Sequence, residues 1–390
     1  MKSKNVVNNK SEMKKSIVIF YHRDPNNSHR GQGRYLSNIV KALSTRNNIE
    51  IIGGKTSIAF EKESTFINLL FNILNSHTNI IKFYLNFPKL NGKKKMNGLL
   101  IAEDIYIAPI SILISKLLGV KMLYHAHDFG KVYRKEVSSH FRASKLIYAI
   151  SILFERVAIR FSCYTIVPSL RLKEKLLQST PWMNEERLLY FPYIAKPEAP
   201  DIANINQFKS AYNLEDKFPV VFIGPTDYLP NVTAINEIIS LSNKIEDRCP
   251  QIIFIIGGIG TKHFEGEARR NLIFLGEVSD LDTLLYSCYV GLTPVKTPGG
   301  ISIKTVDYLV HGLRVISTPE GAFGIPRNDQ MIICRLSEFE SALQELFKDF
   351  NNGHMTAIKV SKEVEEYFLS NLDEIIFLDK IDAILRKPSR

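Results

Sequence analysis

Short apolar runs recur along the chain and alternate with segments whose apolar residues are spaced three and four positions apart. In the first half the runs are 16–21, 50–54, 98–102, 121–127 and 163–169, and after the proline-containing stretch 191–200 they resume at 219–224, 251–258, 271–277, 289–295, 314–318 and 331–336. Runs of this length predict buried strands, and segments such as GRYLSNIVKALS between them predict helices. Nearly continuous apolar strands that alternate with helices are typical of parallel sheets covered on both faces.

The second half of the chain repeats the pattern of the first, and 390 residues is about twice the ~100–200 residues of a typical domain. We therefore predict an α/β protein of two Rossmann-like, doubly wound domains, residues 1–192 and residues 193–390, which face each other across a central cleft. In such domains ligands bind at the carboxyl ends of the strands.

The composition is that of an ordinary globular protein. The four cysteines argue against a fold held by disulfides and against one held by a cysteine zinc site. Cys163, Cys249, Cys288 and Cys334 are widely scattered and form no CxxC pair. This spacing supports neither a disulfide framework nor a cysteine zinc site, so we expect a reducing, cytoplasmic compartment.

Charge divides the chain into two unlike halves. Residues 1–190 hold 30 Lys and Arg against 13 Asp and Glu, a net charge of +17, whereas residues 191–390 hold 20 against 27, a net charge of −7. A basic half favours an anionic partner, although a merely solvated basic face is the alternative. Aromatic residues form no recognisable stacking platform, so we expect no nucleic acid.

The anionic cytoplasmic leaflet of a membrane remains as a partner for the basic half. No segment reaches the ~18 uncharged residues of a membrane span. Residues 144–161 combine basic ends with Leu, Ile and Phe, a pattern typical of an amphipathic helix on a bilayer and equally of a helix packed on its own sheet. We therefore expect peripheral association at most.

Two glycine-containing loops precede predicted helices. Gly31 and Gly33 precede the first helix, where backbone amides can face an anion, although such a pair is also common in tight turns. The second loop carries Gly299 and Gly300, which permit close backbone approach, and opens into a helix near Ile301 or Ser302.

The helix after the second loop carries a cation and a carboxylate three positions apart. Lys304 in the first turn can hold a diphosphate together with the loop amides, and Asp307 can accept hydrogen bonds from ribose hydroxyls. Taken alone, Lys304 and Asp307 equally fit a surface ion pair.

The segment GGISIKTVDYLVHGLRVISTPEGAFGI resembles the C-terminal signature of the retaining glycosyltransferases of family 4, also called group 1, in a variant of bacterial surface-polysaccharide enzymes. GRYLSNIVKAL, YHAHDF, CYTIVPS and FIGPTDYLPNVTAI follow the family order, and the resemblance covers residues 16–330. It implies the GT-B fold and a hexosyltransferase that moves a sugar, with retention, from a nucleotide diphosphate sugar to a hydroxyl of a glycan or polyprenyl-linked acceptor. It implies neither a metal nor another cofactor, and Asp280-Leu281-Asp282 reads as a helix start.

The resemblance also implies roles for single residues. His127 meets the transferred sugar and acts in catalysis with Lys304, and His125 is the competing match for His127. The residues expected to bind the donor are Gly31, Gly33, Gly224, Gly299, Gly300, Ile301, Ser302 and Asp307. Further candidates are Asp128, Val278 and Glu320, the last of which also fits a turn cap.

Two departures from the family pattern leave an alternative open. Gly299 stands where the family has its first signature Glu, and the Arg and Lys that many members carry after the first strand of the second domain are absent from GPTDYLPN. These losses favour a catalytically weak, glycosyltransferase-like binding or accessory subunit, whereas Lys304 and Asp307 favour an enzyme. A sugar-nucleotide epimerase would need proton-abstracting groups that the strand ends do not supply.

Overall fold

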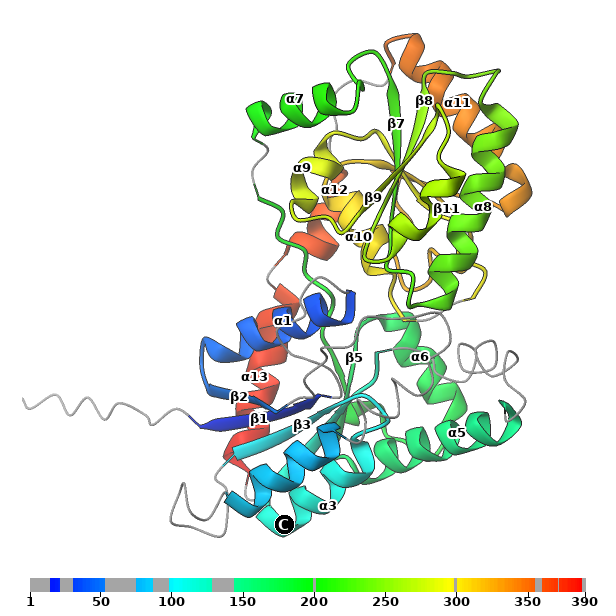
Figure 1. Ribbon diagram of the computed structural model, residues 1–390. Helices are drawn as coiled ribbons and strands as arrows, with labels where there is room; N and C mark the ends of the chain where they lie inside the picture. The colour runs from blue at the N-terminus through cyan, green and yellow to red at the C-terminus, as the bar shows by residue number, and fades with distance from the viewer. Residues whose placement is uncertain are drawn as a thin grey trace, which may run out of the picture.

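The computed structural model of the protein describes residues 15–21, 31–52, 75–86, 98–127, 144–198, 201–297, 300–354, 360–370 and 372–387. Two six-stranded sheets form the centres of two domains, one above the other in Figure 1. Every strand pairing within the two sheets is parallel. The predicted pair of doubly wound α/β domains is therefore confirmed.

The first sheet has the strand order β2-β1-β3-β4-β5-β6. Its strands are β1 (Ser16–Tyr21), β2 (Asn48–Ile52), β3 (Gly98–Glu103), β4 (Lys121–His125), β5 (Tyr164–Val167) and β6 (Leu188–Tyr190). Its helices are α1 (Gly31–Ser44), residues 75–86, α3 (Ala108–Leu118), α5 (Ser144–Phe161) and α6 (Leu170–Ser179). The apolar pattern predicted five of these strands; β6 has only three residues, too few for a visible periodicity.

The second sheet has the order β12-β11-β10-β7-β8-β9. Its strands are β7 (Phe218–Ile223), β8 (Ile252–Gly257), β9 (Leu272–Gly276), β10 (Val290–Thr293), β11 (Arg314–Ser317) and β12 (Met331–Ile333). Its helices include α7 (Ile202–Ala211), α8 (Leu229–Ile245), α9 (Leu281–Tyr286), α10 (Ile303–Val310) and α11 (Phe339–Asn351). Asp280 caps α9 by accepting a hydrogen bond from the amide of Thr283, as expected for a helix start.

The C-terminal helix α13 (Leu372–Arg386) returns to the first domain, where it lies beside α1 and β1 (Figure 1). The ring of Phe377 packs 4.6 Å from that of Phe191 between centroids, and Lys15 and Lys121 donate hydrogen bonds to carbonyls at the end of α13. The predicted boundary placed this helix in the second domain. Its buried aromatic face decides otherwise, since burying a large ring is worth about 1.5–3 kcal/mol.

None of the helices in the described ranges combines the length and the hydropathy needed to cross a bilayer.

Candidate functional site

The carboxyl ends of β3 and β4 place one acidic and two histidine side chains together. Glu103 pairs in register with His125 on the neighbouring strand, so both side chains point to the same face. His125 Nδ1 lies 2.8 Å from Glu103 Oε2, and His127 Nε2 lies 2.7 Å from the same oxygen. Glu103 and His125 are fully buried, and His127 is nearly so.

The charges in this group follow from burial and from the two imidazoles. Burial alone would raise the pKa of Glu103, but His125 and His127 outweigh it and lower that pKa to about 2. Burial lowers the pKa of His125 despite the nearby carboxylate. Glu103 is therefore ionised at neutral pH and can only accept, so His125 is a neutral imidazole that donates its Nδ1 proton.

Glu103, His125 and His127 are also the one group among the described residues whose donor atoms lie close enough together to hold a metal ion. One carboxylate and two imidazoles suit zinc in their chemistry. However, one nitrogen of each histidine already lies at hydrogen-bond distance from the carboxylate, so hydrogen bonds hold the three side chains together without an ion, while the buried Nε2 of His125 has no hydrogen-bond partner. The group is best described as a hydrogen-bonded triad.

Lys304, at the start of α10, belongs to the second-domain side of the site, and the triad belongs to the first-domain side. We call these two sides the walls of the site. The Nζ of Lys304 donates to Oδ1 of Asn231 at 2.5 Å and lies 4.1 Å from the centroid of the Phe222 ring. No carboxylate among the described residues forms an ion pair with it, and burial lowers its pKa to about 7. A half-charged ammonium without a counter-ion is a strong site for an incoming anion.

The loops after β7 and β8 approach each other beside Lys304. Gly258 has φ +136°, and a Cβ there would lie 2.4 Å from the carbonyl oxygen of Gly224, so only glycine fits. Asn231 donates to the carbonyl of Pro225 at 2.8 Å while it accepts from Lys304. Asn231 therefore links the loop that contains Gly224 to the cation.

Asp307 joins the two domains instead of standing free. Arg34 of α1 donates to both of its oxygens, from Nη1 to Oδ2 at 2.6 Å and from Nη2 to Oδ1 at 2.8 Å. Tyr193, between the domains, donates to Oδ1 at 3.2 Å. The carboxylate is 4% exposed and is paired with Arg34. The alternative interpretation, in which Asp307 and Lys304 form a surface ion pair, is therefore wrong.

Helix α1 connects the two walls through consecutive residues. Arg34 reaches Asp307, and the ring of Tyr35 packs 4.9 Å from that of His125 and 6.1 Å from those of His127 and Tyr193. Tyr35 also donates its hydroxyl proton to the carbonyl of Phe191. A movement of α1 would therefore be felt at both walls.

The remaining predicted residues fall into three groups. Gly31 is the first residue of α1, Gly33 is buried in its first turn, and Gly300, Ile301 and Ser302 lie half-buried just before α10, which begins at Ile303. Val278 packs under the second sheet against Gly257. Asp128 and Gly299 lie outside the described residues.

Glu320 belongs to the turn after β11, which meets the first domain. In this turn Thr318, rather than Glu320, accepts the hydrogen bond from the amide of Gly321. Gly324 has φ +79°, and a Cβ there would lie 2.9 Å from Oγ of Ser169. The turn-cap interpretation of Glu320 therefore receives no support from the recorded contacts.

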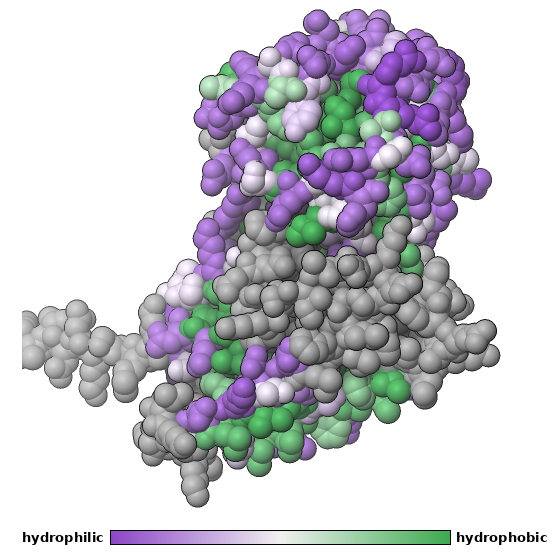
Figure 2. Space-filling view, in the orientation of Figure 1, coloured by the Kyte–Doolittle hydropathy of each residue, from purple (hydrophilic) through white to green (hydrophobic). Residues whose placement is uncertain are grey.

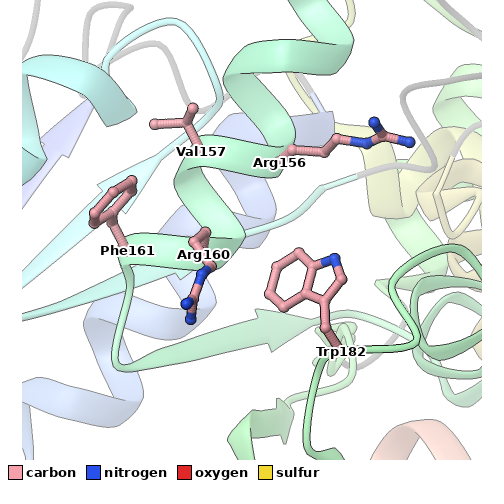
Figure 3. A pocket seen from close by; sticks show the side chains of 5 residues that line it. All are labelled: Arg156, Val157, Arg160, Phe161 and Trp182. Atoms are coloured by element: carbon pink, nitrogen blue, oxygen red, sulfur yellow. The ribbon is translucent and has the colours of Figure 1, made fainter.

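A separate, open apolar pocket lies on the outer face of α5. Figure 3 shows Trp182, from the loop after α6, beside the side chains of Arg156, Val157, Arg160 and Phe161 on that helix. The Arg160 guanidinium lies 5.8 Å from the centroid of the Trp182 ring. None of these residues belongs to the two walls described above.

Sequence reasoning missed four residues of the interdomain site. Glu103 directly follows the predicted strand that precedes the strand of His125, and this position at a strand end was a usable signal. Asn231 lies within the PTDYLPN segment. Arg34 and Tyr193 carried no local signal, because their partner Asp307 is 273 residues from Arg34 and 114 from Tyr193.

Comparisons with known proteins agree with this architecture. Residues 217–349 match the family model described as "Glycosyl transferases group 1", and no curated protein sequence matches the chain significantly. The predicted resemblance to this group is confirmed.

Three solved structures are similar over nearly the whole chain. Anabaena HepE in complex with UDP-glucose has 14% identity and a TM-score of 0.65, over 95% of this chain and 99% of that one. The sucrose-phosphate synthase of Thermosynechococcus elongatus has 14% identity and a TM-score of 0.68, over 96% and 98%. A glycosyltransferase from Rickettsia africae has 13% identity and a TM-score of 0.66, over 96% and 100%. The predicted GT-B fold is confirmed.

The triad makes a pH-dependent contribution to stability that can be measured. Replacing Glu103 by Gln should lower the free energy of unfolding at pH 7 by about 1–3 kcal/mol, because two buried imidazole N–H groups lose their anionic acceptor. The pKa of Glu103 is lowered to about 2 in the folded protein, so the wild-type advantage is complete above the unfolded pKa and is lost as pH falls from about 4.5 toward 2. Urea unfolding at several pH values measures the difference.

Glu50→Gln is the matched control. Glu50 lies exposed on β2, and partial desolvation raises its pKa, so this variant should stay within about 0.5 kcal/mol of wild type at pH 7. A Glu103→Gln effect that does not shrink on acidification would contradict the ionised triad.

Proposed function

We propose that this protein is a retaining, hexosyltransferase-type glycosyltransferase of family 4 that moves a sugar from a nucleotide diphosphate sugar to a hydroxyl of a glycan or polyprenyl-linked acceptor. Its place would be the synthesis of a bacterial surface polysaccharide, at the cytoplasmic face of the membrane. The match of residues 217–349 to the group 1 glycosyltransferases supports transferase chemistry. The UDP-glucose in the similar HepE structure supports a nucleotide-sugar donor.

The observation that carries the proposal is Lys304, which donates to the side-chain amide of Asn231 and has no ion pair with a carboxylate of the described residues. When the bond between the sugar C1 and the diphosphate oxygen breaks, the electron pair stays on the diphosphate. A preorganised cation and backbone amides stabilise that developing charge most strongly in the transition state. We assign this role to Lys304, the start of α10 and the Gly300 backbone, and we expect the reaction to need neither a metal nor another cofactor.

The other half of the reaction needs a positioned sugar and a deprotonated acceptor. We assign His127 to the sugar, held in orientation by Glu103 at 2.7 Å, because an imidazole fixed by a carboxylate presents one defined ring orientation. The acceptor oxygen forms the new bond to C1 on the face that the leaving group vacates, and its proton passes to the leaving phosphate oxygen. Atoms and charge then balance without an enzymic nucleophile.

A lipid-linked acceptor fits the outer surface of the first domain. Leu113 and Leu117 on α3 are 55% and 49% exposed, and Leu153 and Phe161 on α5 are 57% and 54% exposed. Figure 2 shows hydrophobic residues gathered along the lower end of the molecule, where Figure 1 places α3. Basic side chains interleave with them, since Lys116 lies 5.0 Å from the centroid of the Phe161 ring.

This combination supports shallow insertion into an anionic leaflet, where apolar side chains enter the interface and each Lys or Arg adds about 1 kcal/mol. Helix α5 packs on its own domain through Ala158 and Ile159, and its exposed Leu153 and Phe161 support the bilayer interpretation of the other face. Lys93, Lys94, Lys95 and Arg142, which also belong to the basic first half of the chain, lie outside the described residues.

The donor can be identified without knowing the acceptor. Thermal unfolding with UDP-, GDP-, ADP- and dTDP-linked sugars should reveal one nucleotide class that raises the melting temperature, since a ligand at 100 times its Kd adds about 2.7 kcal/mol. Transfer to a lipid-linked acceptor fraction should then persist in EDTA and give a product with the donor's anomeric configuration. No stabilisation by any donor would overturn the proposal. Stabilisation without turnover would identify the binding or accessory subunit.

Lys304 should give donor binding a characteristic pH dependence. Because burial holds its pKa near 7 and a bound diphosphate favours the ammonium, the Kd of the nucleoside diphosphate should rise as pH increases above 7, by up to about tenfold per unit. The diphosphate itself is already ionised there, with a last pKa of about 6. Isothermal titration from pH 7 to 9 measures the trend.

Lys304→Ala should bind at least about tenfold more weakly at pH 7 and lose the trend, because a charge-assisted hydrogen bond contributes about 1.5–3 kcal/mol. Lys296→Ala is the matched control, since Lys296 lies exposed and is paired with Glu237 at 2.6 Å. A folded Lys304→Ala variant with wild-type affinity and the same pH profile would remove Lys304 from the site.

Membrane association can be followed through Trp182, the one tryptophan of the chain, which is 48% exposed beside α5. With anionic phosphatidylglycerol vesicles its emission should shift to shorter wavelength and be quenched by brominated lipid. Neutral vesicles should have little effect, and salt should weaken binding, since the Debye length falls from about 10 Å at 0.1 M to 3 Å at 1 M.

Leu153→Glu should lower vesicle binding at least fivefold, because it places a carboxylate in the inserted face. The matched control is Ile202→Glu on α7 of the second domain, a position of 64% exposure. Equal binding to both lipids, or none to either, would reduce the basic domain to a solvated surface.

A further inference from the structure

In this structure three donors already occupy the carboxylate of Asp307, to which we assign the ribose. Both of its oxygens accept from Arg34, and Oδ1 also accepts from the hydroxyl of Tyr193. The side chain is 4% exposed, so a sugar hydroxyl can reach it only where one of these donors moves away. Arg34 holds two of the three hydrogen bonds, so a ribose that places two hydroxyls on Asp307 displaces Arg34.

Displacement is chemically balanced only if Arg34 gains another anion. A guanidinium removed from its buried carboxylate and left without an anion is disfavoured, because the buried charge of the partner then stays uncompensated. The donor brings both groups at once, because its ribose carries hydroxyls that suit Asp307 and its diphosphate carries the anion that suits Arg34.

We propose that Arg34 is a cation exchanged during donor binding: the ribose replaces it on Asp307, and its released guanidinium binds the diphosphate. This inference rests on the proposed function and adds to it a substrate-binding residue from the first domain. Arg34 would then supply the bidentate phosphate contact that the loop GPTDYLPN lacks, since that loop contains neither Arg nor Lys.

The positions of the charged groups favour this exchange. Lys304 and Asp307 lie three residues apart on α10, so their Cβ atoms are about 5–6 Å apart, a short step for a side chain as long as arginine. Arg34 lies in the first turn of α1, beside Gly33, and its guanidinium is 5.9 Å from the centroid of the Tyr193 ring. A planar guanidinium can pair with phosphate oxygens in the same fork geometry that it uses for a carboxylate.

The exchange also couples binding to the domain interface. In this structure the Arg34–Asp307 pair holds the two domains together. With donor bound, the same two residues would connect the domains through the nucleotide. Inorganic pyrophosphate supplies only one of the two new partners, because it attracts Arg34 but gives Asp307 no hydrogen-bond donor. It should therefore bind wild type poorly.

Three ligands distinguish the exchange from an Arg34–Asp307 pair that only holds the domains together. They are the nucleoside diphosphate selected in the donor screen, its parent nucleoside, and inorganic pyrophosphate. Isothermal titration of Asp307→Asn should show pyrophosphate affinity raised at least fivefold, because a neutral amide releases Arg34, while nucleoside diphosphate affinity falls. Adding Arg34→Ala to that variant should abolish the gain. Arg34→Ala alone should weaken the nucleoside diphosphate at least tenfold and strengthen the nucleoside.

If the Arg34–Asp307 pair only holds the domains together, without exchange, the predicted increases in affinity become decreases. Loosening the interface alone would weaken the binding of all three ligands in both variants, and that result, or an Asp307→Asn variant whose pyrophosphate affinity is unchanged, would overturn the proposal. Failure of the proposed function looks different, because wild type would then bind none of the nucleoside diphosphates in the screen.

Two control variants guard against general effects on folding and domain contact. Arg46→Ala breaks ion pairs of 2.7 and 2.8 Å to Asp379 and Asp382 on α13, remote from the cleft, and should leave the three affinities unchanged. Tyr193→Phe removes one hydrogen bond from Asp307 and keeps Arg34 in place, so it should not raise pyrophosphate affinity. If Arg34→Ala unfolds, Arg34→Gln tests the same prediction with a polar side chain of similar length.

Discussion

Parallel pairing of every strand is the constraint on which the site depends. Inside each sheet the backbone polar groups are paired and the side chains are apolar, so polar side chains gather where the strands end. The strand ends supply Glu103 and His125 on the first-domain side of the junction between the domains, and helix α10 supplies Lys304 and Asp307 on the second-domain side. Parallel pairing thus gathers charged groups from distant segments at one junction.

Charge in this cleft is held in three physically different ways before any ligand arrives. Glu103 stays ionised because two imidazoles donate to it, Arg34 and Asp307 neutralise each other, and Lys304 is held at a lowered pKa of about 7 by burial. In the reaction that we propose, the diphosphate would bring an anion to Lys304 and the ribose would bring hydroxyl donors to Asp307.

The two chemical tasks of the proposed reaction occupy different ends of the molecule. The groups that we assign to the donor lie at the domain junction, whereas helices α3 and α5 lie at the end of the molecule remote from the second domain (Figure 1). Such a separation would let a bilayer hold the first domain while the second remains free to exchange donor and product. Helix α1 connects these functions, since it belongs to the first domain and contacts both walls of the cleft through Arg34 and Tyr35.

The sequence by itself determined every strand except β6, the two-domain α/β architecture and the local motif around Lys304, because these depend on apolar periodicity and on residues a few positions apart. Glu103 beside His125 depends on the register between two strands, and the pairing of Arg34 with Asp307 depends on how two domains meet across 273 residues. The docking of α13 on the first domain likewise follows from Phe377 meeting Phe191. Only the tertiary structure decides such contacts, since no local pattern encodes which distant side chain will satisfy a buried charge or cover a buried ring.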